Sequence, residues 1–169
     1  LSRVAASGGE VQVLHTPDRK KNEAMFYDPH YVPGGKAVLF SIVTPAVSGE
    51  YFTGGYAAVL DLKTGEKRIL EQGAYGARVV PGGYLVFGRE ATLFAVPFDV
   101  ERLRARGTPV PVMEGIYSHS SVAPVFAFSD TGTLVYVPGG RQQFNNALVW
   151  VDRKGEERPL ATPPGRYQA

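Results

Sequence analysis

The chain has 169 residues, of which 18 are basic and 16 acidic, so its formal net charge at pH 7 is only +2. The basic residues are scattered and form no stripe, which argues against nucleic acid as a partner. No apolar run approaches the roughly 18 residues of a membrane-spanning helix, so we expect no membrane insertion by this segment, and the lack of cysteine excludes disulfides and thiolate metal sites.

Twenty glycines and thirteen prolines alternate with Val, Leu, Phe and Tyr, a composition typical of many short strands joined by turns. The chain is therefore expected to be all-β. Residues 1–16 carry the tight turn SGGE, followed by a strand that ends near Leu14, which predicts a hairpin. We interpret this hairpin as the second half of a four-stranded unit whose first half is missing.

Residues 17–73 are expected to form a complete unit of four antiparallel strands, with the turn PGGK after its first strand and KTGE after its third. Residues 74–117 are expected to form a second unit, which opens its second strand from PGGY. The last strand of this second unit, TPVPVME, contains two prolines, which cannot donate ladder hydrogen bonds. This strand should therefore lie at an outer edge.

Residues 118–162 predict a third unit, in which SDTG takes the place of the first turn and RKGE that of the second, and residues 163–169 would begin a further one. The first turns start at Pro33, Pro81 and Ser129, each 48 residues after the one before. Such a period, with several short strands per repeat, indicates successive blades of a β-propeller. The predicted fold is a propeller fragment of about three complete four-stranded blades plus a half blade.

Closed propellers have at least about four blades, so this fragment is expected to be an incomplete ring with open flanks. An uncovered blade would expose its apolar face. The cover would be the rest of a longer protein or a second copy of this chain in a homodimer.

The tract RVVPGGYLVFGREATLFAVPFDVERLRARGTPVPVMEGI, with FAFSDTGTLVYVPGG and LVWVDRKGEERPL after it, resembles the WD40-like (PD40, TolB-like) propeller repeats of bacterial proteins. It is most similar to the propellers that lie C-terminal to a membrane-anchored serine/threonine protein kinase domain, and TLFAVPFD is distinctive for that group. The resemblance covers essentially the whole chain. It implies a periplasmic or otherwise extracytoplasmic propeller that binds or senses a protein or ligand, without catalysis of its own.

The sequence contains no kinase signature and no G-x-S-x-G elbow. We therefore expect no enzyme activity and no cofactor, and any catalytic domain would lie outside this chain. TolB's binding residues have no matching motif here. Two alternatives to the kinase-linked receptor stay open: the substrate-gating propeller of a prolyl-oligopeptidase-like serine peptidase, and a structural half-propeller that assembles with itself.

Candidate binding residues are expected on the rim opposite the glycine turns, because antiparallel strands place the short turns on one rim and the longer connections on the other. Aromatic and amide side chains in these connections are suited to recognition. The predicted residues are Tyr51, Phe52, Tyr75, Tyr117, His119, Gln142, Phe144 and Asn145. The alternative is that the aromatic side chains fold back onto the blades as lids.

Arg78 lies in a strand expected to line the propeller axis, where its guanidinium could bind an anionic ligand or form a structural ion pair. His119 begins a strand that could face the central channel. The histidines have no metal-ligand spacing, so no metal site is expected, and His30 is expected to pack.

Four aspartates sit beside predicted turns: Asp61, Asp99, Asp130 and Asp152. A carboxylate at such a position readily accepts hydrogen bonds from the backbone of the turn, so we expect all four to act in this way. Trp150 is flanked by alternating apolar residues and is expected to be buried between blades.

Overall fold

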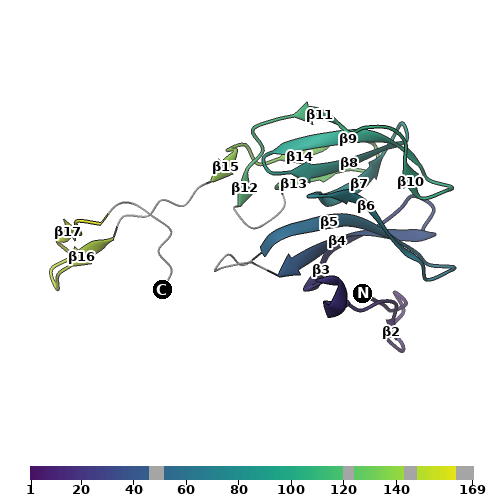
Figure 1. Cartoon of the computed structure of the whole chain (residues 1–169), viewed down its shortest axis with the longest axis horizontal. Coiled ribbons are helices and arrows are strands. Elements are labelled where there is room, and N and C mark those ends of the chain that lie inside the picture. The colour runs from purple at the N-terminus through teal and green to yellow at the C-terminus, as the bar shows by residue number, and fades with distance from the viewer. Residues whose placement is uncertain (46–51, 120–123, 143–147, 163–169) are drawn as a thin grey trace.

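Antiparallel strands make up most of the regular structure in the computed structural model, which describes residues 1–45, 52–119, 124–142 and 148–162 (Figure 1). The described residues include one short 3₁₀ turn, η1 (Arg19–Lys21), and no α-helix. Within this part of the chain, no helix is therefore long and apolar enough to cross a membrane. The prediction of an all-β chain is confirmed.

The first sheet is a four-stranded meander in the order β3-β4-β5-β6, within the range expected for the first complete unit. Its strands are β3 (Met25–Tyr31), β4 (Ala37–Pro45), β5 (Phe52–Asp61) and β6 (Lys67–Gln72). Residues 37–44 of β4 are all buried, which explains why this strand reads as a nearly continuous apolar run rather than as an alternating one. Both faces of the sheet must therefore be covered.

The second sheet has the order β10-β9-β8-β7, and β11 also pairs with β9. Its strands are β7 (Tyr75–Val80), β8 (Tyr84–Arg89), β9 (Thr92–Asp99), β10 (Arg104–Ala105) and β11 (Val110–Met113). Pro111 lies in β11, which pairs with β9 alone in the described part of the chain. The outer-edge position expected from the two prolines is confirmed, whereas β10 was not expected.

The two sheets pack face to face, and alternate side chains of each strand enter the core between them, as the two-residue period of a strand requires. Leu39 and Val59 reach it from the first sheet, and Leu85 and Phe87 from the second. A polar contact also joins the sheets, because the buried Ser41 Oγ accepts a hydrogen bond from the Gly76 amide at 3.1 Å.

Each sheet is covered on its outer face by a hairpin. The hairpin of β1 (Ser2–Arg3) and β2 (Gln12–Val13) brings Leu1 and Leu14 against the first sheet, on the face that buries Phe40 and Ile42. The hairpin of β13 (Phe126–Phe128) and β14 (Leu134–Tyr136) covers the second sheet at Val86 and Leu93. Hairpin, sheet, sheet and hairpin thus form a row of stacked layers.

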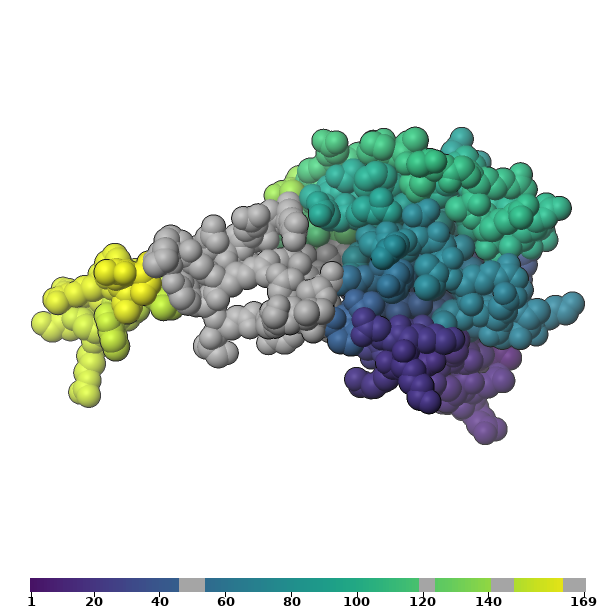
Figure 2. Space-filling model, in the orientation of Figure 1, coloured from purple at the N-terminus to yellow at the C-terminus, as the bar shows by residue number. Residues whose placement is uncertain are grey.

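Residues 118–162 differ from the single four-stranded sheet expected for them. Their described strands form separate pairs: the parallel pair β12 (Ser118–His119) with β15 (Arg141–Gln142), the β13–β14 hairpin, and the hairpin of β16 (Val149–Val151) with β17 (Glu157–Pro159). The last hairpin stands apart from the sheets (Figures 1 and 2). Trp150 is 71% exposed there, so its expected burial is wrong.

The physical reason lies in what each sheet can pack against. Strands β4 and β8 are sandwiched between layers, so their apolar side chains are buried on both faces. The β13–β14 hairpin has a sheet on one face only, and its Val135 is 64% exposed. Within the described residues, no further layer offers β16 and β17 an apolar surface to bury.

Three of the four turn aspartates hold their turns as expected. Asp61 Oδ1 accepts from the Lys63 and Thr64 amides at 2.8 and 3.1 Å, and Asp152 Oδ1 accepts from the Lys154 amide at 2.7 Å. Asp99 Oδ1 accepts from the Arg102 amide at 3.0 Å, while its Oδ2 bonds the side chains of Arg102 and Arg106.

Asp99 makes folding stability pH-dependent. The Arg106 guanidinium, and then the Arg102 amide, hold the pKa of Asp99 well below its usual value. Because the folded pKa lies below the unfolded one, this stabilisation is present above the unfolded pKa of about 3.9 and declines as the pH falls below it. We expect Asp99→Asn to lower stability at neutral pH and to reduce the further loss in acid. Urea unfolding at about pH 7 and about pH 3 measures both effects.

Candidate functional site

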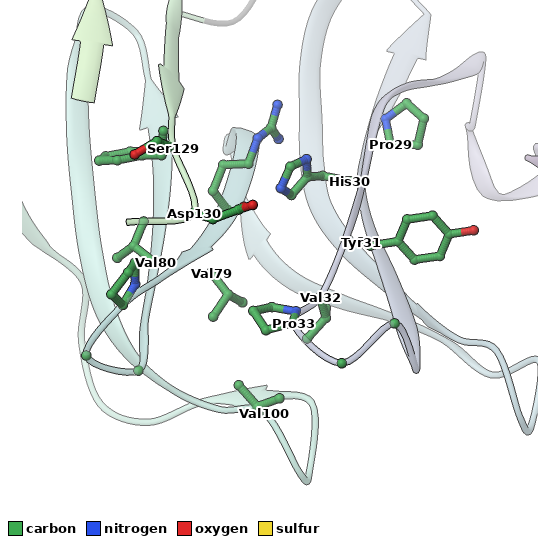
Figure 3. A pocket seen from close by; sticks show the side chains of 17 residues that line it. Pro29, His30, Tyr31, Val32, Pro33, Val79, Val80, Val100, Ser129 and Asp130 are labelled. Atoms are coloured by element: carbon green, nitrogen blue, oxygen red, sulfur yellow. The ribbon is translucent and has the colours of Figure 1, made fainter. Parts of the chain in front are cut away.

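A cavity of about 810 Å³ opens where β3, β7 and β13 run into their turns (Figure 3). The end of β3 and its turn supply residues 29–35, the end of β7 and its turn supply 78–83, and the end of β13 supplies 128–130. Val100, which follows β9, completes the lining. The cavity, called the cleft below, therefore lies at the glycine-turn end of the sheets, opposite the rim on which the sequence placed most candidate residues.

Two glycine turns line the cleft. Gly34 and Gly35 have φ values of +86° and +71°, and Gly82 and Gly83 have +93° and +78°. L-residues with side chains rarely adopt these conformations, so the turns need glycine at these positions. Proline and valine side chains beside the glycines then make much of the lining apolar.

An ion pair joins two of the three strands that form the cleft. Arg78 Nη2, on β7, donates to Asp28 Oδ1 and Oδ2 on β3 at 2.8 and 2.9 Å, and Arg78 Nη1 donates to the Ala77 carbonyl at 3.0 Å. Both side chains are largely buried, with 15% and 28% exposed. Of the two roles considered for Arg78, the structure shows the ion pair, and the guanidinium charge is already balanced.

His30 lines the cleft in the position on β3 that Arg78 occupies on β7, 48 residues later. The side chain is exposed rather than packed, which corrects the expectation for this residue. Partial desolvation, and then the charge of Arg78, lower the pKa of His30, although Asp28 and Asp130 act in the opposite direction. Since the ordinary pKa of histidine is already below 7, this lowering leaves the imidazole mostly neutral at pH 7.

Asp130 also lines the cleft, and its side chain lies near His30 (Figure 3). Its expected role in the turn is wrong, because Ser129 takes that role: Ser129 Oγ accepts from the Thr133 amide at 3.0 Å and bonds Thr131 Oγ1 at 2.9 Å. Among the residues that the structure describes, no hydrogen-bond or ion-pair partner lies on the Asp130 carboxylate. Asp130 is thus a free acceptor facing a cavity.

Two of the predicted rim residues pack against glycine. The Tyr75 ring lies so close to Gly55 that a Cβ built there would be 2.6 Å from Tyr75 Cε1, and burial raises the pKa of the Tyr75 phenol. Tyr117 similarly covers Gly139, where an added Cβ would lie 3.3 Å from Tyr117 Cδ2. Both rings follow the alternative in which aromatic residues fold back onto the scaffold.

The structure also places His119 and Gln142 opposite each other in the parallel β12–β15 pair. Phe52 lies at the start of β5, where its backbone pairs with Pro45. The side chains of Phe52, His119 and Gln142 lie outside the described part of the structure, as do Tyr51, Phe144 and Asn145 altogether. Arg78 is the only predicted binding residue that the described structure places in the cleft.

Sequence reasoning named Arg78, on a strand expected to line the axis, but missed Asp130 as a site residue and placed most candidates on the opposite rim. The 48-residue spacing contains a signal for the cleft, because equivalent positions in successive repeats should converge once the sheets stack. His30 on β3 and Arg78 on β7 are such a pair, and Asp130 follows β13.

The cleft is lined mainly by proline, valine and glycine, with Arg78, His30 and Asp130 among its polar groups. No group of three or more His, Asp or Glu side chains in the described residues could hold a metal ion. Comparison with protein-family models and with curated proteins finds no match for this chain.

Proposed function

We propose that this chain is a non-catalytic binding module, built as part of a β-propeller with about three blades and a half blade. The 48-residue repeat and the row of stacked layers support the propeller. In a propeller the first strand of each blade lies nearest the axis. On that reading β3, β7 and β13 are the inner strands, and the cleft is the mouth of the central channel.

The observation that carries the binding function is the cleft itself. Its volume of about 810 Å³ falls within the range of roughly 300–1,000 Å³ typical of ligand pockets, and its largely apolar lining with a few polar groups is also typical. His30 has no hydrogen-bonded nucleophile among the described residues, as a covalent mechanism would need. The polar groups are thus suited to recognition.

The similarity to TolB-like repeats supports a wider setting for this module. We place it in the extracytoplasmic or periplasmic part of a kinase-linked receptor. In the gating alternative, the cleft would be the channel entrance of a serine peptidase whose catalytic domain lies elsewhere. A kinase domain and a membrane helix on the N-terminal side of the full reading frame would favour the receptor, and a hydrolase elbow on the C-terminal side would favour the peptidase.

The exposed apolar side chains of β13–β14 and β16–β17 support the self-assembly alternative. A homodimer would bury them and close the propeller. Light scattering measures the mass of the protein in solution over a range of concentrations. A monomer mass at every concentration would contradict the self-assembly alternative.

Selection of peptides from a phage-displayed random library tests the binding function. We expect the selected peptides to bind the protein and to lose affinity about tenfold, or 1.4 kcal/mol, when His30 is replaced by alanine. Tyr27→Ala is the matched control, because Tyr27 is an exposed aromatic residue on the same strand that does not line the cleft. The affinity of Tyr27→Ala for the selected peptides should stay within about twofold of that of the parent protein.

Two outcomes would contradict the proposal. Enrichment of no peptide would oppose a peptide-binding module. Peptides that tolerate His30→Ala but not the combined alanine substitution of Tyr51, Phe52 and Phe144 would place recognition on the opposite rim. If peptide binding survives that combined substitution, these rim residues do not form the recognition site.

A further inference from the structure

We propose that the cleft recognises a basic side chain, lysine or arginine, of a bound peptide, and that the Asp130 carboxylate receives its charge. This inference rests on the proposed binding function and adds the chemistry of the ligand. It follows from the charges in the cleft, from the surroundings of Asp130 and from the shape of the walls.

The charges of the cleft sum to a negative value. The bidentate contact of Arg78 with Asp28 balances those two groups, and His30 is mostly uncharged at pH 7 because its pKa is lowered. The Asp130 carboxylate remains, without a hydrogen-bond or ion-pair partner in the described structure. A cationic ligand would be attracted to it, whereas an anionic ligand would meet this charge and find no uncommitted cation among the lining residues.

Asp130 needs no change in the fold to accept a ligand. Its turn is closed by Ser129, whose backbone amide also donates to the Thr133 carbonyl at 2.9 Å. The other turn aspartates differ in this respect, since Asp61, Asp99 and Asp152 are each committed to backbone amides. Of these four residues, Asp130 alone has a carboxylate that neither caps a turn nor pairs with an arginine.

The lining beside Asp130 suits the aliphatic part of a basic side chain. Val80 lies on one side of the cleft, and Val79 and Pro33 lie between it and β3 (Figure 3). Pro81 and Phe128 also line the cleft. Lysine and arginine bury their methylene chains against such surfaces while the charged end reaches a polar group. A small inorganic cation would gain nothing from these contacts.

The size of the cleft favours a peptide over a free amine. A volume of about 810 Å³ is much larger than a short alkylamine fills, and ligand pockets bury most of the surface of what they bind. A lysine within a peptide should therefore bind more tightly than the same ammonium group on a small molecule.

NMR titration of the isotope-labelled protein tests the inference with four probes: n-butylammonium, butyrate, n-butanol and the blocked tripeptide acetyl-Gly-Lys-Gly-amide. We expect n-butylammonium and the tripeptide to shift the amides of residues 30–32 and 129–130, and the tripeptide to bind at least about tenfold more tightly than n-butylammonium. Butyrate and butanol should give no saturable shifts there. Asp130→Asn should weaken tripeptide binding about tenfold or more, as loss of a charged partner implies.

Glu157→Gln is the matched control for net charge, because Glu157 is an exposed carboxylate on the separate β16–β17 hairpin. It should leave tripeptide affinity unchanged. Equal binding of butyrate and n-butylammonium, or unchanged tripeptide affinity in Asp130→Asn, would overturn the inference. Equal affinity for n-butylammonium and the tripeptide would contradict the claim that the cleft recognises the basic group as part of a peptide.

The failure of this inference is distinguishable from failure of the binding function. If phage-selected peptides bind the cleft in the His30 test yet bind Asp130→Asn as well as the parent protein, the module stands and the cation specificity is wrong. If no peptide binds the cleft at all, the binding function is wrong as well.

Discussion

Replacing Phe87 with alanine is expected to lower the free energy of unfolding by about 3–5 kcal/mol. Phe87 is completely buried in the core between the two sheets, and its ring stacks on Phe94 with centroids 5.9 Å apart and planes 11° from parallel. The substitution removes apolar contacts from both sheets and leaves a cavity that rigid strands on either side can close only in part.

Urea unfolding of the variant and the parent protein measures this loss. Tyr84→Ala on the same strand is the matched control, because Tyr84 is 44% exposed and its loss should cost less than about 1 kcal/mol. If Phe87→Ala costs no more than Tyr84→Ala, the two sheets do not pack face to face as described.

The second large effect concerns the most buried ion pair of the described structure. Lys67 Nζ on β6 contacts the Glu23 carboxylate, and only 11% and 6% of these side chains are exposed. Glu23 Oε2 also accepts from the Asp18 amide at 2.9 Å, and Lys67 Nζ lies 5.1 Å from the centre of the Phe26 ring. Lys67→Met would leave a buried carboxylate without its cation, which typically costs about 3–5 kcal/mol.

Lys36→Met is the matched control for this prediction. The Lys36–Glu101 pair has 36% and 84% of its side chains exposed, and such surface pairs contribute about 1 kcal/mol or less. Adding Glu23→Gln to Lys67→Met should recover part of the lost stability, because the unpaired charge is removed. Equal losses for Lys67→Met and Lys36→Met in chemical denaturation would contradict the buried pair.

Much of the fold between residues 17 and 117 could be predicted because each strand carries its own signals. Glycine turns with positive φ, an apolar run in β4 and a proline in the edge strand β11 are local features, and tertiary packing agrees with them. Residues 118–162 carry similar local signals, but their described strands form separate pairs. Burial depends on a neighbouring layer, and a strand's own sequence does not say whether that layer is present.

The site was less predictable than the fold, for a reason that Asp130 illustrates. Both Ser129 and Asp130 can accept hydrogen bonds from a turn, so SDTG does not reveal which of the two is left free. Arg78 could be named as a candidate from its strand, but its partner Asp28 is 50 residues away and meets it only because β3 and β7 lie side by side. Tyr75 and Tyr117 pack on glycines that sequence spacing does not connect to them.

The central claim is that recognition takes place in the cleft between the inner strands. Hydrogen–deuterium exchange of the full chain, with and without a saturating phage-selected peptide, tests it most directly. We predict that the peptide slows exchange in residues 29–35, 78–83 and 128–130, which line the cleft. Slowed exchange confined to the opposite rim, at Tyr75 and Tyr117–His119, with the cleft amides unchanged, would contradict it.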